Sequence, residues 1–198
     1  MMDPRGSDRL KYWKDQIAVL YLVQNEVQRL DQLGLYEYYY PELAATEAQL
    51  TAVEAHLGHR LDQDYRDFLL CANGWKGFIQ DFNLFGTGDL MGSALMDDAM
   101  LTLQIYDEEH VLEASGFTKA ELLPIAAAPF GKDLFTIARP TSRQPGVVVW
   151  FAGEEIERRP DFREYFLAMT DYNRLEIEGF KKDIAERERQ AGRDADKA

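Results

Sequence analysis

The 198-residue sequence predicts an α+β protein in which helices flank an antiparallel sheet, and three observations support this prediction. In the first 72 residues, apolar side chains recur every three or four positions, as in amphipathic helices. Between residues 78 and 151 they form short runs separated by Pro and Gly signals, as in an antiparallel meander. From residue 161 the helical spacing returns. Because 46% of the residues are apolar, the chain can bury a sizeable core.

The first predicted helix covers residues 10–33. Trp13, Ile17 and Leu20 begin an apolar stripe that continues at helical spacing, and Gly34 is a typical helix stop. The tyrosine-rich segment 36–40 breaks this pattern. We interpret it as a linker whose rings pack on neighbouring elements, with a binding role for the rings as the alternative.

Two shorter helices are predicted over residues 46–57 and 62–72. Thr46 and Gln49 have the spacing of a capping box, in which each side chain reaches the backbone of the other residue. Asp62 is a suitable N-cap for the second helix. An Asn-Gly pair follows that helix, and both residue types tolerate the left-handed conformation in which helices commonly end.

The central part of the chain supplies the predicted sheet. An aromatic run bounded by glycines indicates a strand or a strand pair, and three later apolar runs indicate further strands. Residues 94–114 between them indicate helical pieces with loops. From Asp161 a long helix is predicted, with a possible break at Gly179 and a charged, solvated end after Ile184. The predicted strands are 78–85, 122–125, 134–137 and 147–151.

Composition and charge exclude several classes of protein. The sequence has no apolar run of 18 residues, which argues against a membrane span, and its first residues lack the features of a secretory signal. A single cysteine cannot form an internal disulfide, so a reducing, cytoplasmic setting is expected. The net charge of −13 disfavours binding to nucleic acid or to an anionic membrane surface. Basic proteins are better candidate partners.

The sequence points to neither an enzyme nor a metal or cofactor site. His56 and His59 have a spacing that one helix could use for a metal, but the glycine between them is expected to end that helix. Cys71 lies on a predicted buried helix face without a nearby base, so it reads as a small apolar residue. The neighbouring acids at 97–98 and 107–109 lack the loop pattern of a calcium site. We therefore predict no catalytic residues, no metal and no cofactor.

One stretch, residues 46–74, carries a more specific pattern. A helix with a Glu before Leu-Gly is followed by a Leu that precedes a second helix, then by Tyr, Phe-Leu and Asn-Gly. A later Leu-Pro-Ile at 123–125, followed by Gly-Lys-Asp-Leu-Phe at 131–135, adds a second set of matches. In this order and spacing the sequence resembles the SUKH superfamily, which groups bacterial immunity proteins with a fungal regulator of cell-wall glucan synthesis. The matching residues of the first stretch are Glu54, Leu57, Gly58, Leu61, Tyr65, Phe68, Leu69, Asn73 and Gly74.

The resemblance implies a bent antiparallel sheet with helices packed on it, and it implies no catalysis. It covers residues 41–158, so residues 1–40 are expected to form an N-terminal helical extension and residues 159–198 a C-terminal helix with a charged tail. Asp62 stands where the family usually has Pro, and either residue can start a helix. Residues 126–130 are apolar where the family often has polar loop residues, so no loop binding site is carried over.

The charges are distributed unevenly along the chain. Between Lys76 and Lys119 there is no Lys or Arg, although this window contains eight acidic residues. A concentrated negative field of this kind accelerates capture of a basic partner, whereas the plainer interpretation is a solvated acidic face. Trp75 beside the window is a further candidate contact, although its more probable place is the core. The predicted partner-binding residues are Asp81, Asp89, Asp97, Asp98, Asp107, Glu108, Glu109 and Trp75.

Together these observations favour an immunity protein that neutralises a cognate bacterial toxin by binding it in the cytoplasm. A basic nuclease or nucleotide-using toxin would fit best, because an acidic surface competes with phosphates for a basic pocket. One alternative is a regulatory or scaffold module that binds cellular proteins without a toxin, and a second is a small hydrolase. The sequence leaves the oligomeric state open.

Overall fold

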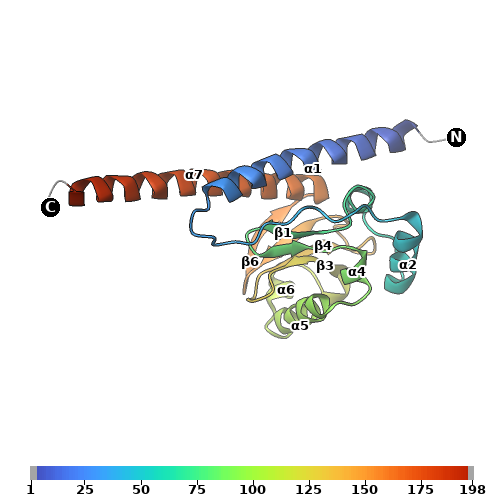
Figure 1. Ribbon diagram of the computed structural model, residues 1–198. Helices are drawn as coiled ribbons and strands as arrows, with labels where there is room; N and C mark the ends of the chain where they lie inside the picture. The colour runs from blue at the N-terminus through green and yellow to red at the C-terminus, as the bar shows by residue number, and fades with distance from the viewer. Residues whose placement is uncertain (1–3, 196–198) are drawn as a thin grey trace.

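A computed structural model describes residues 4–195 of the chain (Figure 1). Helices lie at both ends of the described chain and strands lie in its centre, as the sequence predicts. The elements in chain order are α1 (Pro4–Leu30), α2 (Glu47–Leu57), α3 (Gln63–Leu69), β1 (Trp75–Ile79), β2 (Phe82–Leu84), α4 (Thr87–Leu90), α5 (Ala94–Glu108), α6 (Val111–Ala114), the 3₁₀ helix η1 (Lys119–Glu121), β3 (Leu122–Ala127), β4 (Leu134–Ala138), β5 (Val148–Phe151), β6 (Glu155–Arg159) and α7 (Phe162–Ala195).

The six strands form one sheet in the order β1-β2-β3-β4-β5-β6, and every neighbouring pair is antiparallel. This confirms the predicted α+β fold and its antiparallel meander. The predicted strand at 78–85 is the β1–β2 pair, whose register places Trp75 opposite Leu84. The register shifts between Pro124 and Ala126 in β3, and such irregularities are where an antiparallel sheet bends.

The sheet lies between two helical layers. Helices α1 and α7 run along one side of it, while α5 lies on the other side (Figure 1). Trp13 of α1 is fully buried, with ring centroids 5.4 Å from both Phe162 and Phe166 of α7 and 5.8 Å from Phe68 of α3. The apolar faces of the two end helices therefore pack against the central domain and against each other.

The two predicted helix starts have the expected caps. Thr46 and Gln49 form a capping box, in which the Gln49 amide donates to Thr46 Oγ1 at 3.2 Å and Gln49 Oε1 accepts from the Thr46 amide at 2.8 Å. Asp62 Oδ1 accepts from the backbone amides of Asp64 and Tyr65 at 3.0 and 3.1 Å. These caps fix the residues at which α2 and α3, the two helices before the sheet, begin.

The structure differs from the sequence-based prediction at several places, beginning with α1, which covers Pro4–Leu30 instead of residues 10–33. Helix α3 ends at Leu69, earlier than the predicted limit at residue 72. Strand β6 was not predicted. Helix α7 continues through Gly179 without the possible break, because an exposed glycine costs a helix only about 1 kcal/mol relative to alanine.

Strand β1 is an edge of the sheet, and α1 and α7 satisfy part of its free backbone. The Gln24 side chain of α1 donates to the carbonyl oxygens of Gly77 and Phe78, both at 2.8 Å, and Asn173 of α7 donates to the Phe78 carbonyl at 3.2 Å. Gln24 and Asn173 are both buried. The helices thus cover an edge that would otherwise be available for strand pairing.

No helix within residues 4–195 combines the length and the apolar character needed to cross a membrane.

Candidate functional site

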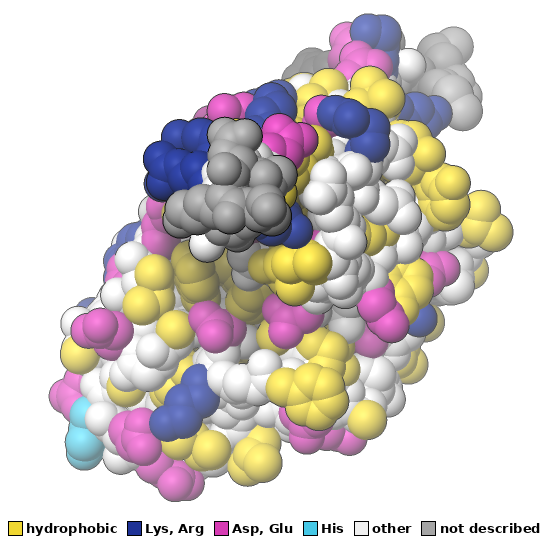
Figure 2. Space-filling model, turned by 60° about the vertical axis from the view of Figure 1, so that its left-hand side comes forward, with side chains coloured by type: hydrophobic (Ala, Val, Ile, Leu, Met, Phe, Trp, Pro, Cys, Tyr) yellow, Lys and Arg dark blue, Asp and Glu magenta, His cyan; other side chains and the backbone are white. Residues whose placement is uncertain are grey.

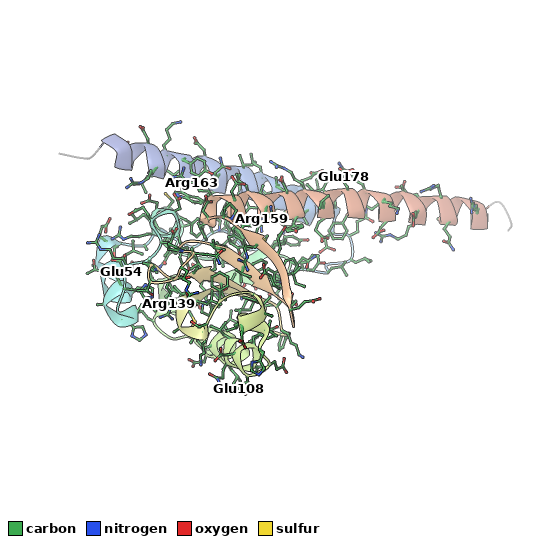
Figure 3. All side chains as sticks on the ribbon, turned by 180° about the vertical axis from the view of Figure 1, so that it is seen from behind. Glu54, Glu108, Arg139, Arg159, Arg163 and Glu178 are labelled. Atoms are coloured by element: carbon green, nitrogen blue, oxygen red, sulfur yellow. The ribbon has the colours of Figure 1, made fainter. Side chains whose placement is uncertain are left out.

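Helix α5 presents most of the predicted partner-binding residues. Its buried side consists of Met96, Ala99, Leu103 and Tyr106, and this stripe fixes which positions face outward. Ser93 caps the helix by accepting from the Met96 amide at 3.1 Å. Figure 3 shows Glu108 on the side of the molecule opposite α1 and α7. All five predicted acids on and just after this helix are exposed, and we name them the α5 acidic face: Asp97, Asp98, Asp107, Glu108 and Glu109.

The α5 acidic face forms no ion pair among the described residues. Acids elsewhere behave differently, since Asp67 pairs with Arg9 at 2.7 Å and Asp64 pairs with Arg163 at 2.7 Å. Lys119, at the end of the base-free window, donates to Gln104 of α5 and not to a carboxylate of this face. Among residues 7–193, whose side chains the structure describes, no Lys or Arg lies within ion-pair distance of the face.

Two apolar side chains lie among these acids and were not predicted as site residues. Leu101 is 59% exposed and Ile105 is 40% exposed, and both fall on the outward side of α5 between Asp98 and Glu108. Their exposure could have been predicted from the helical spacing, because neither residue is in register with the buried stripe of the same helix. The face thus combines an apolar centre with an acidic border, which is the arrangement of many protein-binding surfaces.

Tyr106 connects the C-terminal end of α5 to one end of the sheet. Its hydroxyl donates to the Lys132 carbonyl in the β3–β4 loop and accepts from the Gly153 amide in the β5–β6 turn at 2.9 Å. Burial raises the pKa of Tyr106, so its hydroxyl stays protonated and keeps its donor role at neutral pH. These hydrogen bonds anchor the C-terminal end of α5 to the sheet.

The remaining three predicted residues lie elsewhere. Asp81 is exposed in the β1–β2 turn and lines a hollow at the end of the sheet. Asp89 is half-buried in α4 and accepts from the Gly86 amide at 3.0 Å, which is a local structural role. Trp75 is 1% exposed, and its indole N–H donates to the Tyr39 carbonyl at 3.0 Å. It lies in the core and is not accessible to a partner.

The described residues show no constellation typical of a metal centre. Within residues 4–195, no group of three His, Cys, Asp or Glu side chains is placed to hold an ion. Cys71 is half-buried, and its thiol lies 3.5 Å from the Leu10 carbonyl. Burial raises the pKa of this thiol, which disfavours the reactive thiolate.

Comparison with known proteins adds a family to this geometry. The model of the SMI1 / KNR4 family (SUKH-1) matches residues 44–168, which is more than half of the chain. The matched range extends from the segment before α2 through the whole sheet and into the first turns of α7. A search of curated proteins found no match to this chain.

Proposed function

Because the chain belongs to the SMI1 / KNR4 family (SUKH-1), we propose that it is an immunity protein that binds and neutralises a cognate bacterial toxin. It acts by covering part of the toxin in the cytoplasm of the cell that it protects, and it catalyses no reaction. SUKH proteins include immunity proteins, and this supports the proposal. The observation that carries it here is the exposed and unpaired α5 acidic face.

The charge of this face defines the kind of partner. Exposed carboxylates without ion pairs attract basic side chains, and they accelerate encounter by ~10–1,000-fold when the partner surface is complementary. A nuclease or another nucleotide-using toxin has a basic pocket that normally binds phosphates. The α5 acidic face would compete for that pocket, so we propose this class of toxin as the partner.

The apolar centre of the face supplies binding energy that charge alone does not. Exposed carboxylates at the border of an interface act mainly on the association rate, whereas buried apolar contacts near its centre act on dissociation. Leu101 and Ile105 occupy the central position on α5. We propose them as the contacts that are desolvated when the toxin binds.

The test combines rescue of growth with charge reversal. The chain is co-expressed with the toxic domain of the secreted protein encoded next to its gene, and its association rate with that domain is measured. Reversal of Asp97, Asp98, Glu108 and Glu109 to Lys should slow association about tenfold or more and weaken protection, while the fold survives. Raising the ionic strength should weaken the wild-type complex more than the reversed one, because the Debye length is only ~8 Å at physiological salt.

A matched control reverses four acids on the outer half of α7, namely Glu178, Asp183, Glu186 and Glu188. All four are exposed. This variant has the same net charge as the first but keeps the α5 acidic face, so it should retain rescue and most of the association rate. Unchanged association in the α5 variant, or the absence of a toxin gene and of any rescue, would overturn the proposal.

A further inference from the structure

A hollow of about 350 Å³ opens at the end of the sheet where the β1–β2 turn, the β3–β4 loop and α7 meet. We call it the end hollow. Figure 2 views this end of the molecule and shows hydrophobic side chains in a recess below α7, with acidic side chains at its border. From the other side of the sheet, Tyr106 of α5 reaches the same β3–β4 loop by donating to the Lys132 carbonyl.

Aromatic rings form the floor of the end hollow. Trp150 stacks on Phe135 with ring centroids 5.2 Å apart, and its ring is 6.3 Å from that of Tyr172 in an edge arrangement. Phe82 approaches Trp150 in an edge arrangement, with ring centroids 6.4 Å apart. The Trp150 indole N–H donates to Asp133 Oδ1 at 2.9 Å. The floor is therefore a rigid set of rings whose faces attract cations.

Three carboxylates border this floor: those of Asp81, Asp133 and Glu176. None of them takes part in an ion pair among the described residues, and no Lys or Arg lines the hollow. Glu176 is held by the Gln80 side chain, which donates to its Oε1 at 2.6 Å. The hollow thus concentrates negative charge around an aromatic floor and contains no cation of its own.

Phe130 adds an uncovered apolar ring to the border. It belongs to the β3–β4 loop, lines the hollow and is 88% exposed. A large ring this exposed gains free energy when a partner covers it. Its place next to the carboxylates matches the alkyl stem of a long basic side chain, which is apolar along its length and charged at its end.

We propose that the end hollow receives an arginine side chain from the toxin. This inference rests on the proposed function and adds a second contact to that of the α5 acidic face. A guanidinium group is planar, so it can stack on Trp150 while it donates hydrogen bonds to the surrounding carboxylates, and its stem can pack against Phe130. A lysine ammonium is more strongly hydrated and cannot stack in this way, so we expect it to bind less tightly.

The test uses the whole chain and N-acetyl-arginine amide as the probe. The NMR signal of the Trp150 indole N–H is followed while the probe is added up to about 30 mM, a range suited to weak binding. We expect a saturable shift, a smaller effect of the lysine analogue, and none with the uncharged citrulline analogue. Absence of saturation with arginine, or an equal response to citrulline, would contradict the proposal.

Matched variants locate the binding site. The double variant Asp81→Asn and Glu176→Gln should weaken probe binding about tenfold, because it removes two of the carboxylates that contact the guanidinium. The double variant Glu186→Gln and Glu188→Gln changes the net charge equally but lies on the outer, exposed half of α7, so its effect should stay within about twofold. Equal weakening by both pairs would show that the probe responds to net charge and not to the end hollow.

The two proposals fail separately. If growth rescue holds and arginine does not bind, the end hollow is not a contact but the immunity function stands. If arginine binds and no toxin is neutralised, the end hollow is an arginine site of a protein with another role.

Discussion

Gly86 is a position where a single methyl group has a large predicted effect. A Cβ atom there would lie 2.1 Å from the Asn73 backbone oxygen, because the Asn-Gly pair of the family pattern packs directly against the start of α4. The side chain of Asn73 fixes this contact by accepting from the Thr87 amide and donating to the Thr87 hydroxyl, both at 2.8 Å. The pair thus follows α3 and anchors the start of α4.

We predict that Gly86→Ala lowers the free energy of unfolding by about 1–3 kcal/mol, near the upper end because the nearest atom belongs to the backbone. Gly88→Ala is the control, since a Cβ atom at Gly88 meets nothing within 4 Å and alanine is the better helix former. Urea unfolding of both variants measures the difference. Equal stability of the two variants would contradict the packing described here.

Glu121 is a second residue with a specific prediction, which concerns pH. Its carboxylate accepts from the backbone amide of Thr118 at 2.9 Å and from that of Arg143 at 3.2 Å, and it also accepts from the hydroxyls of Thr118 and Ser142. These hydrogen bonds lower its pKa from 4.5 to about 2. A lowered pKa stabilises the fold above pH 4.5, and this contribution is lost as the pH falls towards 2.

Glu121→Gln should therefore be less stable than the wild-type protein at pH 7, and the difference should shrink as the pH falls from 4.5 towards 2. Urea unfolding at several pH values measures it. Glu109→Gln serves as the baseline, because Glu109 is exposed and its side chain forms no hydrogen bond among the described residues. A stability difference that does not change with pH would show that the hydrogen bonds of Glu121 do not depend on its charge.

Among the elements, α1 has a role that its apolar stripe alone does not explain. Gln24 is a polar residue on the buried side of this helix, and it satisfies carbonyl groups of strand β1. Replacement by methionine keeps the approximate size but leaves the Gly77 carbonyl without this donor. We predict that Gln24→Met lowers the free energy of unfolding by about 1–3 kcal/mol.

The matched control is Gln28→Met, one turn further along α1 at an exposed position. Its effect should lie within about 0.5 kcal/mol. Thermal or urea unfolding of the pair distinguishes a lost hydrogen bond from a general effect of methionine on α1. A neutral Gln24→Met would mean that β1 does not depend on this helix for its backbone partners.

The elements also show what the sequence could and could not predict. The capping residues Thr46 and Asp62 and the strand runs of the sheet follow from local rules, so they were predicted correctly. Strand β6 has the sequence Glu-Ile-Glu-Arg-Arg and lacks the apolar pattern of a strand, because it is an edge strand whose charged side chains can reach solvent. Backbone pairing with β5 holds β6 in the sheet, although its own side chains carry no strand pattern.

The candidate site was predicted in part for a similar reason. The exposure of the acids on α5 could be predicted from the local sequence, because charged side chains seldom lie buried without a partner. The end hollow does not follow, because Asp81, Trp150 and Glu176 come from three distant segments that only the tertiary fold brings together. Trp75 was predicted as a partner contact, because a tryptophan beside glycines is found both in cores and in interfaces. The structure shows that it is buried and bonded to the Tyr39 carbonyl, so it belongs to the core.

At the level of the whole molecule, the two end helices form part of the same core as the family domain. We predict that deletion of residues 1–34 lowers the melting temperature and the solubility, because it uncovers Phe68, Phe162 and Phe166 where Trp13 now packs. Thermal unfolding and sedimentation of the shortened chain measure both effects. An unchanged melting temperature together with full solubility would show that residues 41–158 fold without this cover.

The contact between α1 and α7 also sets the order of events during synthesis in the cell. Trp13 leaves the ribosome long before Phe162 and Phe166 are made, and at ordinary translation rates the delay is roughly ten to thirty seconds. During that interval the apolar stripe of α1 can reach Phe68 of α3 but lacks its partners on α7. The core is completed only when α7 emerges, so a partly made chain cannot reach the full fold. Under the proposed immunity function, a cell must therefore hold a reserve of finished molecules before a fast toxin arrives.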